Sequence, residues 1–174
     1  MTTNSTDRRL WTVLALLFTT GWATNHFVAM MPVLHERNGI GDAALEVAFG
    51  IYAIGLLPGL LTGGGISDRI GRKPVVLTGA TGAALGNLLM LLWHTEPGVI
   101  VGRFVVGLGV GLAVSAGTAW TADLAGKKGT VFAGATLTAG FAVGPLVSGL
   151  IAQFTAGAAL VAPFVLTVAG SLAA

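Results

Sequence analysis

A short polar stretch, Gly64-Gly65-Ile66-Ser67-Asp68-Arg69-Ile70-Gly71-Arg72-Lys73-Pro74, separates two long apolar runs. A loop this short between bilayer-length runs must return the chain at one membrane face. Gly71 suits a tight turn with positive φ, and Pro74 suits the first position of the next helix. We expect Asp68, Arg69 and Arg72 to form a small ion-paired group there. A plain basic anchor that only fixes topology is the simpler interpretation, but it does not require glycines and an aspartate at these offsets.

The composition points to a chain that lies in a membrane. Of the 174 residues 54% are hydrophobic and only 9% charged, and the mean hydropathy is +0.85. Soluble domains carry about 25% charged residues. The net charge of +2 comes without a basic stripe with interleaved aromatics, so a nucleic-acid partner is not expected. Cysteine is absent, which excludes disulfides and thiolate metal sites.

The hydropathy pattern predicts an all-α membrane protein with six transmembrane helices in one domain. Residues 1–9 form a polar, basic leader, and residues 10–174 form the membrane domain. The first run has 25 residues without a formal charge, too long for a signal peptide. Such a helix is about 37 Å long and crosses a bilayer with some tilt. The predicted spans are 10–34, 43–66, 74–93, 99–122, 129–154 and 156–174. No polar tail follows the last run, so we expect a further half of the protein to be missing.

The basic residues predict the orientation. With the N-terminus in the cytoplasm, the inner side would hold seven Lys or Arg residues and the outer loops one, Arg37. Basic residues favour the cytoplasmic side, so we expect a multi-pass protein of the cell membrane, in a bacterium the inner membrane. The seven are Arg8, Arg9, Arg69, Arg72, Lys73, Lys127 and Lys128.

Glycines recur every fourth residue on several spans and predict close helix packing. Helices in lipid associate through close contact, and small residues let two backbones approach. The repeats are Gly55, Gly59 and Gly63; Gly82 and Gly86; Gly107 and Gly111; Gly140 and Gly144. The run Gly107–Gly111 is not a dinucleotide fingerprint, because it lacks a preceding strand and a soluble βαβ unit.

Three stretches together resemble motifs of the major facilitator superfamily. The stretch from Gly64 to Lys73 is similar to motif A, with Asp68, Arg69, Gly71 and Arg72 in register. The stretch 103–109 is similar to motif B, although Val106 stands where the family has Gln. The stretch 140–149 is similar to motif C of the drug–proton antiporters, although Ser148 replaces a glycine. The motif C positions are Gly140, Gly144, Pro145 and Gly149.

The resemblance implies the N-terminal half of a transporter, built as a 3+3 inverted repeat. Transporters of this kind hold their substrate near the midplane between two halves. The expected function is secondary active transport of a small solute by alternating access, with proton-coupled efflux. The partners would be the bilayer, protons, the solute, and a missing C-terminal half or a second copy. The alternative is a non-transporting half-length fragment or membrane scaffold. No cofactor is implied.

The resemblance also implies residue roles. Asp68 would hold the cytoplasmic gate closed, and Asp123 would accept a hydrogen bond from Arg72, unless it is a solvated loop charge. Arg103, Glu46 and His26 are the candidates for proton coupling. Charges inside a bilayer are costly, but Glu46 and Arg103 lie near span ends, where long side chains can reach water. His26 could instead be a packed, hydrogen-bonded residue. The candidates for lining the substrate cavity are Trp22, Asn25, Tyr52 and Trp120.

Other classes fit less well. An enzyme would need paired carboxylates, a Ser–His pair or metal ligands at membrane depth, and the sequence gives no such spacing. We therefore expect no catalytic residue and no metal site. A channel would need a ring of charges or a carbonyl filter.

Overall fold

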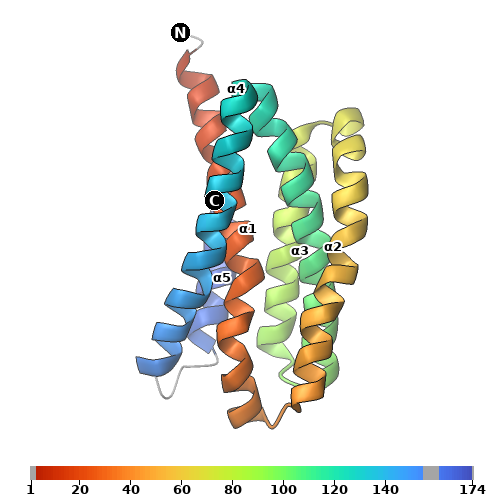
Figure 1. Ribbon diagram of the computed structural model, residues 1–174, viewed down its shortest axis with the longest axis vertical. Coiled ribbons are helices and arrows are strands. Elements are labelled where there is room, and N and C mark those ends of the chain that lie inside the picture. The colour runs from red at the N-terminus through yellow and green to blue at the C-terminus, as the bar shows by residue number, and fades with distance from the viewer. Residues whose placement is uncertain (1–2, 155–160, 174) are drawn as a thin grey trace.

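The computed structural model describes residues 3–154 and 161–173, which are helical except for short joints (Figure 1). Long apolar segments become helices because a bilayer offers no water to the backbone, so each N–H and C=O must pair within the helix. The helices are α1 (Thr3–Asn38), α2 (Asp42–Ile70), α3 (Arg72–Leu92), α4 (Glu96–Phe154) and α5 (Val161–Ala173).

Helix α4 consists of two antiparallel arms. Ala125 has φ −139° and ψ 15°, and Gly126 has φ 58° and ψ −140°, both outside the helical region. Figure 1 shows the chain reversing direction at this point. The first arm (residues 96–124) and the second arm (residues 127–154) correspond to the predicted spans 99–122 and 129–154. A glycine is favoured at the reversal because it adopts positive φ without a steric penalty.

The joints are shorter than the sequence suggested. The predicted spans 43–66 and 74–93 left residues 67–73 as a loop, but α2 continues to Ile70 and α3 begins at Arg72. Only Gly71 lies between them, with the expected positive φ of 99°. Pro74 is therefore the third residue of α3 and not the first. That position is tolerated, since N–H groups in the first helical turn have no intrahelical partner.

Helices α1 to α4 each contain a segment long and apolar enough to cross a membrane. Helix α1 begins at Thr3 and ends at Asn38, so it extends beyond the predicted span 10–34 at both ends and includes most of the predicted leader. Helix α5 has 13 residues. The predicted sixth span, 156–174, includes residues 156–160 and 174, which lie outside the described part of the chain.

Glycines allow α2, α3 and α4 to pack backbone to backbone. Gly55, Gly59 and Gly63 are buried against α4. A Cβ atom added at Gly59 would lie 2.7 Å from the backbone nitrogen of Leu112. At Gly111 it would meet the carbonyl oxygen of Leu56. The prediction of close packing through glycines spaced by four is confirmed for these helices.

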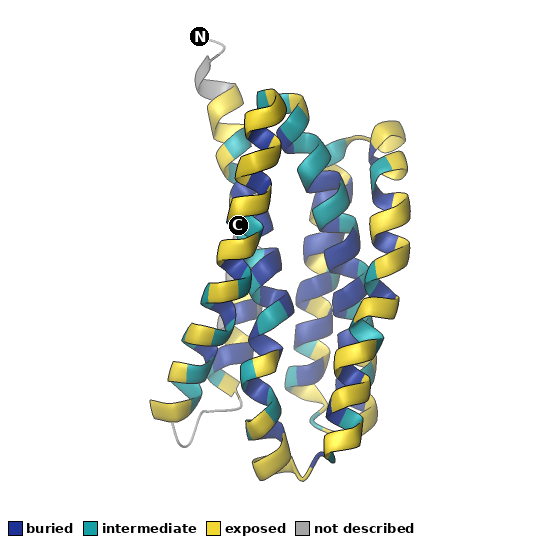
Figure 2. Ribbon diagram, viewed as in Figure 1, coloured by how far each residue is buried: buried dark blue, intermediate teal, exposed yellow. Residues whose placement is uncertain are grey.

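Burial follows the inward faces of the bundle. Figure 2 shows buried residues where helices face one another and exposed residues along the outward face of α2. That outward face is apolar, and includes Val47, Ile54, Leu57 and Leu61. Such a surface suits lipid or another apolar helix and not water.

Candidate functional site

Arg72 connects the α2–α3 joint to the end of the first arm of α4. Its Nη1 lies 2.6 Å from Asp68 Oδ1 and donates to Ser67 Oγ at 2.6 Å. Its Nε donates to Asp123 Oδ2 at 2.7 Å. Gly71 makes this possible, because its positive φ starts α3 directly after α2 and brings Arg72 back over the last turn of α2. The three charges therefore form one network that joins three helical segments.

Arg69 does not take part in this network, contrary to expectation. It is exposed, and within residues 3–154 and 161–173 no ion pair involves it. The reason is helical geometry: Asp68 and Arg72 are four residues apart and share a face, whereas adjacent residues do not. Lys73 is also exposed, and Gly64 contributes its carbonyl as an acceptor for Ser67 Oγ at 2.8 Å.

A second cluster of polar contacts lies within α1 at residues 22–26. Each of these five consecutive residues is hydrogen-bonded to another helical segment, and the partners come from α3, both arms of α4 and α5. The pairs are Trp22 with Thr167, Ala23 with Asn87, Thr24 with Arg103, Asn25 with Phe141, and His26 with Asn87. We call this set the α1 hub. Polar groups at such depth stabilise helix association, because lipid offers them no other partner.

Arg103 reaches the hub from the first arm of α4. Its Nη1 donates to the carbonyl oxygen of Thr24 at 2.9 Å. The guanidinium carbon lies 4.5 Å from the ring centre of Phe27 and 4.4 Å from that of Tyr52, the geometry of a cation–π contact. Its place near a span end left open that the side chain reaches water, but Arg103 is only 1% exposed. The aromatic rings and the Thr24 carbonyl replace part of the water that a surface arginine would have, and among the described residues Arg103 Nε has no hydrogen-bond partner.

His26 is held by an asparagine that the sequence analysis missed. Asn87 Nδ2 donates to the carbonyl oxygens of Ala23 and Ala83, at 3.2 and 3.0 Å, so its Oδ1 is the acceptor. His26 Nε2 lies 2.6 Å from this oxygen and must carry the proton. Within the described part of the chain, His26 Nδ1 is buried without a hydrogen-bond partner, and the ring packs edge-on against Phe164. An amide within an apolar run was the available signal for Asn87.

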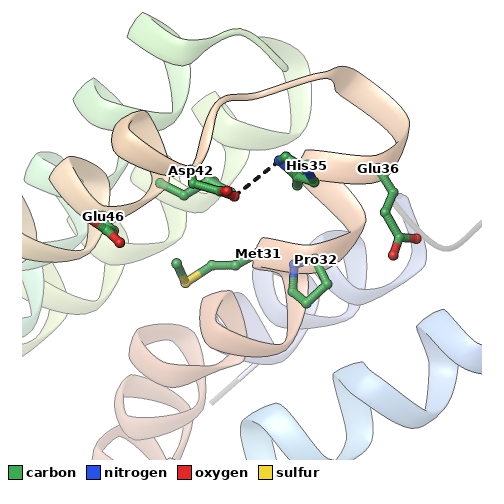
Figure 3. Close-up of a pocket in the computed structure, with 7 residues that line it drawn as sticks. Met31, Pro32, His35, Glu36, Asp42 and Glu46 are labelled. Atoms are coloured by element: carbon green, nitrogen blue, oxygen red, sulfur yellow. Dashed lines mark ion pairs between the residues drawn. The ribbon is translucent and has the colours of Figure 1, made fainter.

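Glu46 is not part of the α1 hub. It is exposed on α2 and lines an open cavity of about 340 Å³ at the α1–α2 joint. Figure 3 shows Asp42 and His35 pointing toward each other, with Asp42 Oδ1 3.2 Å from His35 Nδ1, whereas Glu36 points away. The carboxylates do not converge, and in the described ranges no group of three or more His, Asp or Glu residues is placed to hold a metal.

Three of the four residues expected to line a cavity, Trp22, Asn25 and Tyr52, lie at the α1 hub, and Trp120 lies elsewhere. Trp22 and Asn25 are tied to α5 and to the second arm of α4, and Tyr52 packs on Arg103. Trp120 packs between two apolar clusters that contain Leu16 and Leu17. Apolar spacing alone does not tell which face of a helix turns toward its neighbours.

The motif C positions pack the second arm of α4 against α1. A Cβ atom at Gly140 would meet the carbonyl oxygen of Phe18, and one at Gly144 would lie 3.1 Å from Trp22 Cα. Gly149 faces Ala29 with ordinary contact distance. The helix continues through Pro145, which is half-buried. This close approach is what allows Asn25 to reach a backbone carbonyl of the opposite helix.

Comparison with known proteins gives a family match over nearly the whole chain. Residues 12–174 match the sequence model of the Major Facilitator Superfamily. Proteins named multidrug resistance protein MdtL are similar over 98 residues, which is 56% of this chain. The identity is 35% for Klebsiella pneumoniae (strain 342), 33% for Shewanella oneidensis (strain MR-1) and 32% for Escherichia coli O139:H28. The aligned part spans 24%, 24% and 25% of those relatives, respectively.

Proposed function

Because the chain belongs to the Major Facilitator Superfamily, we propose that it supplies one six-helix half of a secondary active transporter, with a 3+3 inverted repeat. It would move a small solute across the cell membrane by alternating access, in proton-coupled efflux. The observation that carries this proposal is the network of Arg72 with Asp68 and Asp123, which ties the α2–α3 joint to α4 at one end of the bundle. Family membership and four long apolar helices make it a multi-pass membrane protein.

The proposed orientation places the N-terminus and the α2–α3 joint in the cytoplasm. Figure 1 places the start of α1, the joint at Gly71 and the reversal of α4 at one end of the bundle, and the α1–α2 and α3–α4 joints at the opposite end. Seven of the nine Lys and Arg residues belong to the first end. This distribution supports a cytoplasmic assignment, since basic loops are retained on that side.

Asp68 is proposed to hold the cytoplasmic gate closed, with Arg72 orienting its carboxylate. Asp68 is 62% exposed in its side chain and keeps one face free for a helix end of the opposing half. A carboxylate near a helix N-terminus gains about 0.3–1 kcal/mol. Rocking of the two halves would break that contact, while the bonds of Arg72 to Asp123 keep the α2–α3 joint in place.

Arg103 and His26 are the stronger candidates for proton coupling, and Glu46 is the weaker one. Arg103 and His26 lie within one buried polar cluster, the α1 hub, whereas Glu46 is exposed at a helix end. Ionisable groups at membrane depth are costly and commonly functional. The relatives are named for multidrug resistance, so we propose lipophilic compounds as the solute class.

The alternative function is a membrane scaffold that does not transport alone. The matched region covers about a quarter of each relative. Transport is therefore proposed for an assembly that contains this chain and not for the chain alone. The apolar outward face of α2 favours a partner or lipid there. A second copy or a separate C-terminal half would complete the transporter.

Flux measurement separates the two functions. The 174-residue chain would be reconstituted in liposomes with a lipophilic dye inside and an imposed pH gradient, alone and together with the C-terminal half of an MdtL relative. We expect gradient-driven flux only from the completed assembly. If both halves are folded and neither preparation shows flux, the transporter assignment is refuted. Flux from the chain alone would indicate that copies of the chain assemble into a transporter.

A further inference from the structure

The reversal of α4 carries a small apolar hollow with two lysines at its rim. The hollow measures about 200 Å³ and is lined by Lys127, Lys128, Val131 and Phe132. These residues fall within one and a half turns of the second arm of α4, so their side chains share one region of its surface. A hollow of this size is smaller than the 300–1,000 Å³ of pockets that enclose drug-sized molecules. It therefore does not suit the transported solute.

The two lysines have no carboxylate partner in the described part of the chain. The nearest acidic residue in sequence, Asp123, is bound to Arg72. Neither Lys127 nor Lys128 takes part in an ion pair among residues 3–154 and 161–173. Both are exposed, so two positive charges stand free beside the hollow.

The apolar side of the hollow is exposed as well. Val131 is 68% exposed and Phe132 49% exposed, one turn further along the same arm. This order, charge at the helix end and apolar surface one turn inward, matches the order of a phospholipid. Its phosphate lies at the membrane surface and its acyl chains begin a few ångströms deeper. Lysine side chains at a helix end extend toward this level.

We propose that Lys127, Lys128, Val131 and Phe132 form a binding site for an anionic phospholipid of the surrounding leaflet. The ammonium groups bind the phosphate, and Val131 and Phe132 contact the first part of an acyl chain. Zwitterionic lipid fits less well, because its own amine offsets the charge that the lysines attract. The site would fix the reversal of α4 at the membrane surface. This inference depends on membrane insertion and not on transport.

The test measures lipid binding to the purified chain in a non-ionic detergent. Phosphatidylglycerol and phosphatidylethanolamine are titrated separately, and bound lipid is counted by native mass spectrometry. We expect preference for phosphatidylglycerol, and roughly thirtyfold weaker binding in the double variant Lys127→Gln/Lys128→Gln, since each basic residue near an anionic surface contributes about 1 kcal/mol. The matched control, Arg8→Gln/Arg9→Gln, removes the same charge at the same end and should retain the affinity.

Two further measurements distinguish a lipid site from attraction of anions to a basic surface. Phe132→Ala should weaken phosphatidylglycerol binding about fivefold, because the acyl chain loses part of its apolar contact. Glycerophosphoglycerol, the deacylated headgroup, should compete poorly. Equal losses in the lysine and arginine variants would overturn the proposal, as would the absence of a preference for anionic lipid. An unchanged affinity in Phe132→Ala, or full competition by the headgroup alone, would also overturn it.

Discussion

His26 on α1 and Asn87 on α3 share a hydrogen bond of 2.6 Å between His26 Nε2 and Asn87 Oδ1, with both residues fully buried. The amide of Asn87 is saturated, since its nitrogen also donates to Ala23 and Ala83. This pair connects α1 to α3 at the same depth at which Arg103 connects α1 to α4. Residues that were candidates for proton exchange are therefore also contacts that hold the bundle together.

The first prediction concerns Asn87→Ala. It removes the acceptor of His26 and the donor to Ala23 without opening a path to water. We expect a loss of about 1–3 kcal/mol in the free energy of unfolding, because a buried donor is left unpaired. The matched control is Asn25→Ala, which removes one half-buried bond to Phe141 and should cost about 0.6 kcal/mol. Unfolding in mixed micelles measures both, and equal losses would contradict the higher cost predicted for the fully buried Asn87.

The second prediction separates the charge of Arg103 from its shape. Arg103→Ala should abolish proton-linked flux in the completed transporter. Arg103→Lys keeps a cation but not the flat group that lies against Phe27 and Tyr52. If charge carries the coupling, the lysine variant retains a pH-dependent flux with reduced stability. The measurement is flux against pH, with folded protein quantified by size exclusion. Unchanged pH-dependent flux in Arg103→Ala would refute the role of Arg103.

The third prediction is an energetic coupling between Arg72 and Asp123. A double-mutant cycle with Arg72→Gln and Asp123→Asn should give about 0.5–1 kcal/mol, as is typical of partly exposed ion pairs. The coupling should fall in 1 M salt, because exposed charges are screened. The cycle of Arg69→Gln with Asp123→Asn is the control and should give no coupling energy. A coupling at Arg69 as large as at Arg72 would show that the observed pairing is wrong.

The fourth prediction compares two glycines of α2. Gly59→Ala places a Cβ atom 2.7 Å from the nitrogen of Leu112 and should destabilise the bundle by roughly 1–3 kcal/mol through overpacking. Gly65→Ala meets no atom within 4 Å and should be neutral or stabilising by up to about 1 kcal/mol, since alanine favours the helix. Thermal unfolding of the two variants in the same detergent measures the change in stability of each. A destabilisation that is larger at Gly65 would contradict the α2–α4 interface.

Helix existence and close packing could be read from the sequence, but helix ends could not. Apolar runs longer than a bilayer is thick predict helices because no other single-chain element satisfies its backbone in lipid. The positive φ of Gly71 was also predictable. The predicted ends are wrong at the stretch 64–74, where the polar residues suggested a loop. Polar side chains do not end a helix that has reached the membrane surface, because water there solvates them without unwinding the backbone.

Some contacts of the candidate site could likewise be predicted from the sequence, and others could not. Arg72 with Asp68 was predictable from spacing, because residues four apart share a helical face. The bond of Arg72 to Asp123 was implied by the family resemblance, and the structure contains it. Asn87 was overlooked because it carries no charge. The burial of Arg103 was left open, because its place near a span end also allowed contact with water.

The order of residues along the chain is enough to specify a bundle of membrane helices, in which glycines permit backbone contact and one charged joint turns between α2 and α3. Which side of each helix faces its neighbours is settled only by packing in three dimensions, and this packing brings Asn87, Arg103 and Phe141 to α1. The reason is physical. In lipid both the buried and the outward faces of a helix are apolar, so the hydropathy of the sequence does not show which face points toward the other helices. That rotation is set by close contact between helices and by the pairing of the few polar groups at depth.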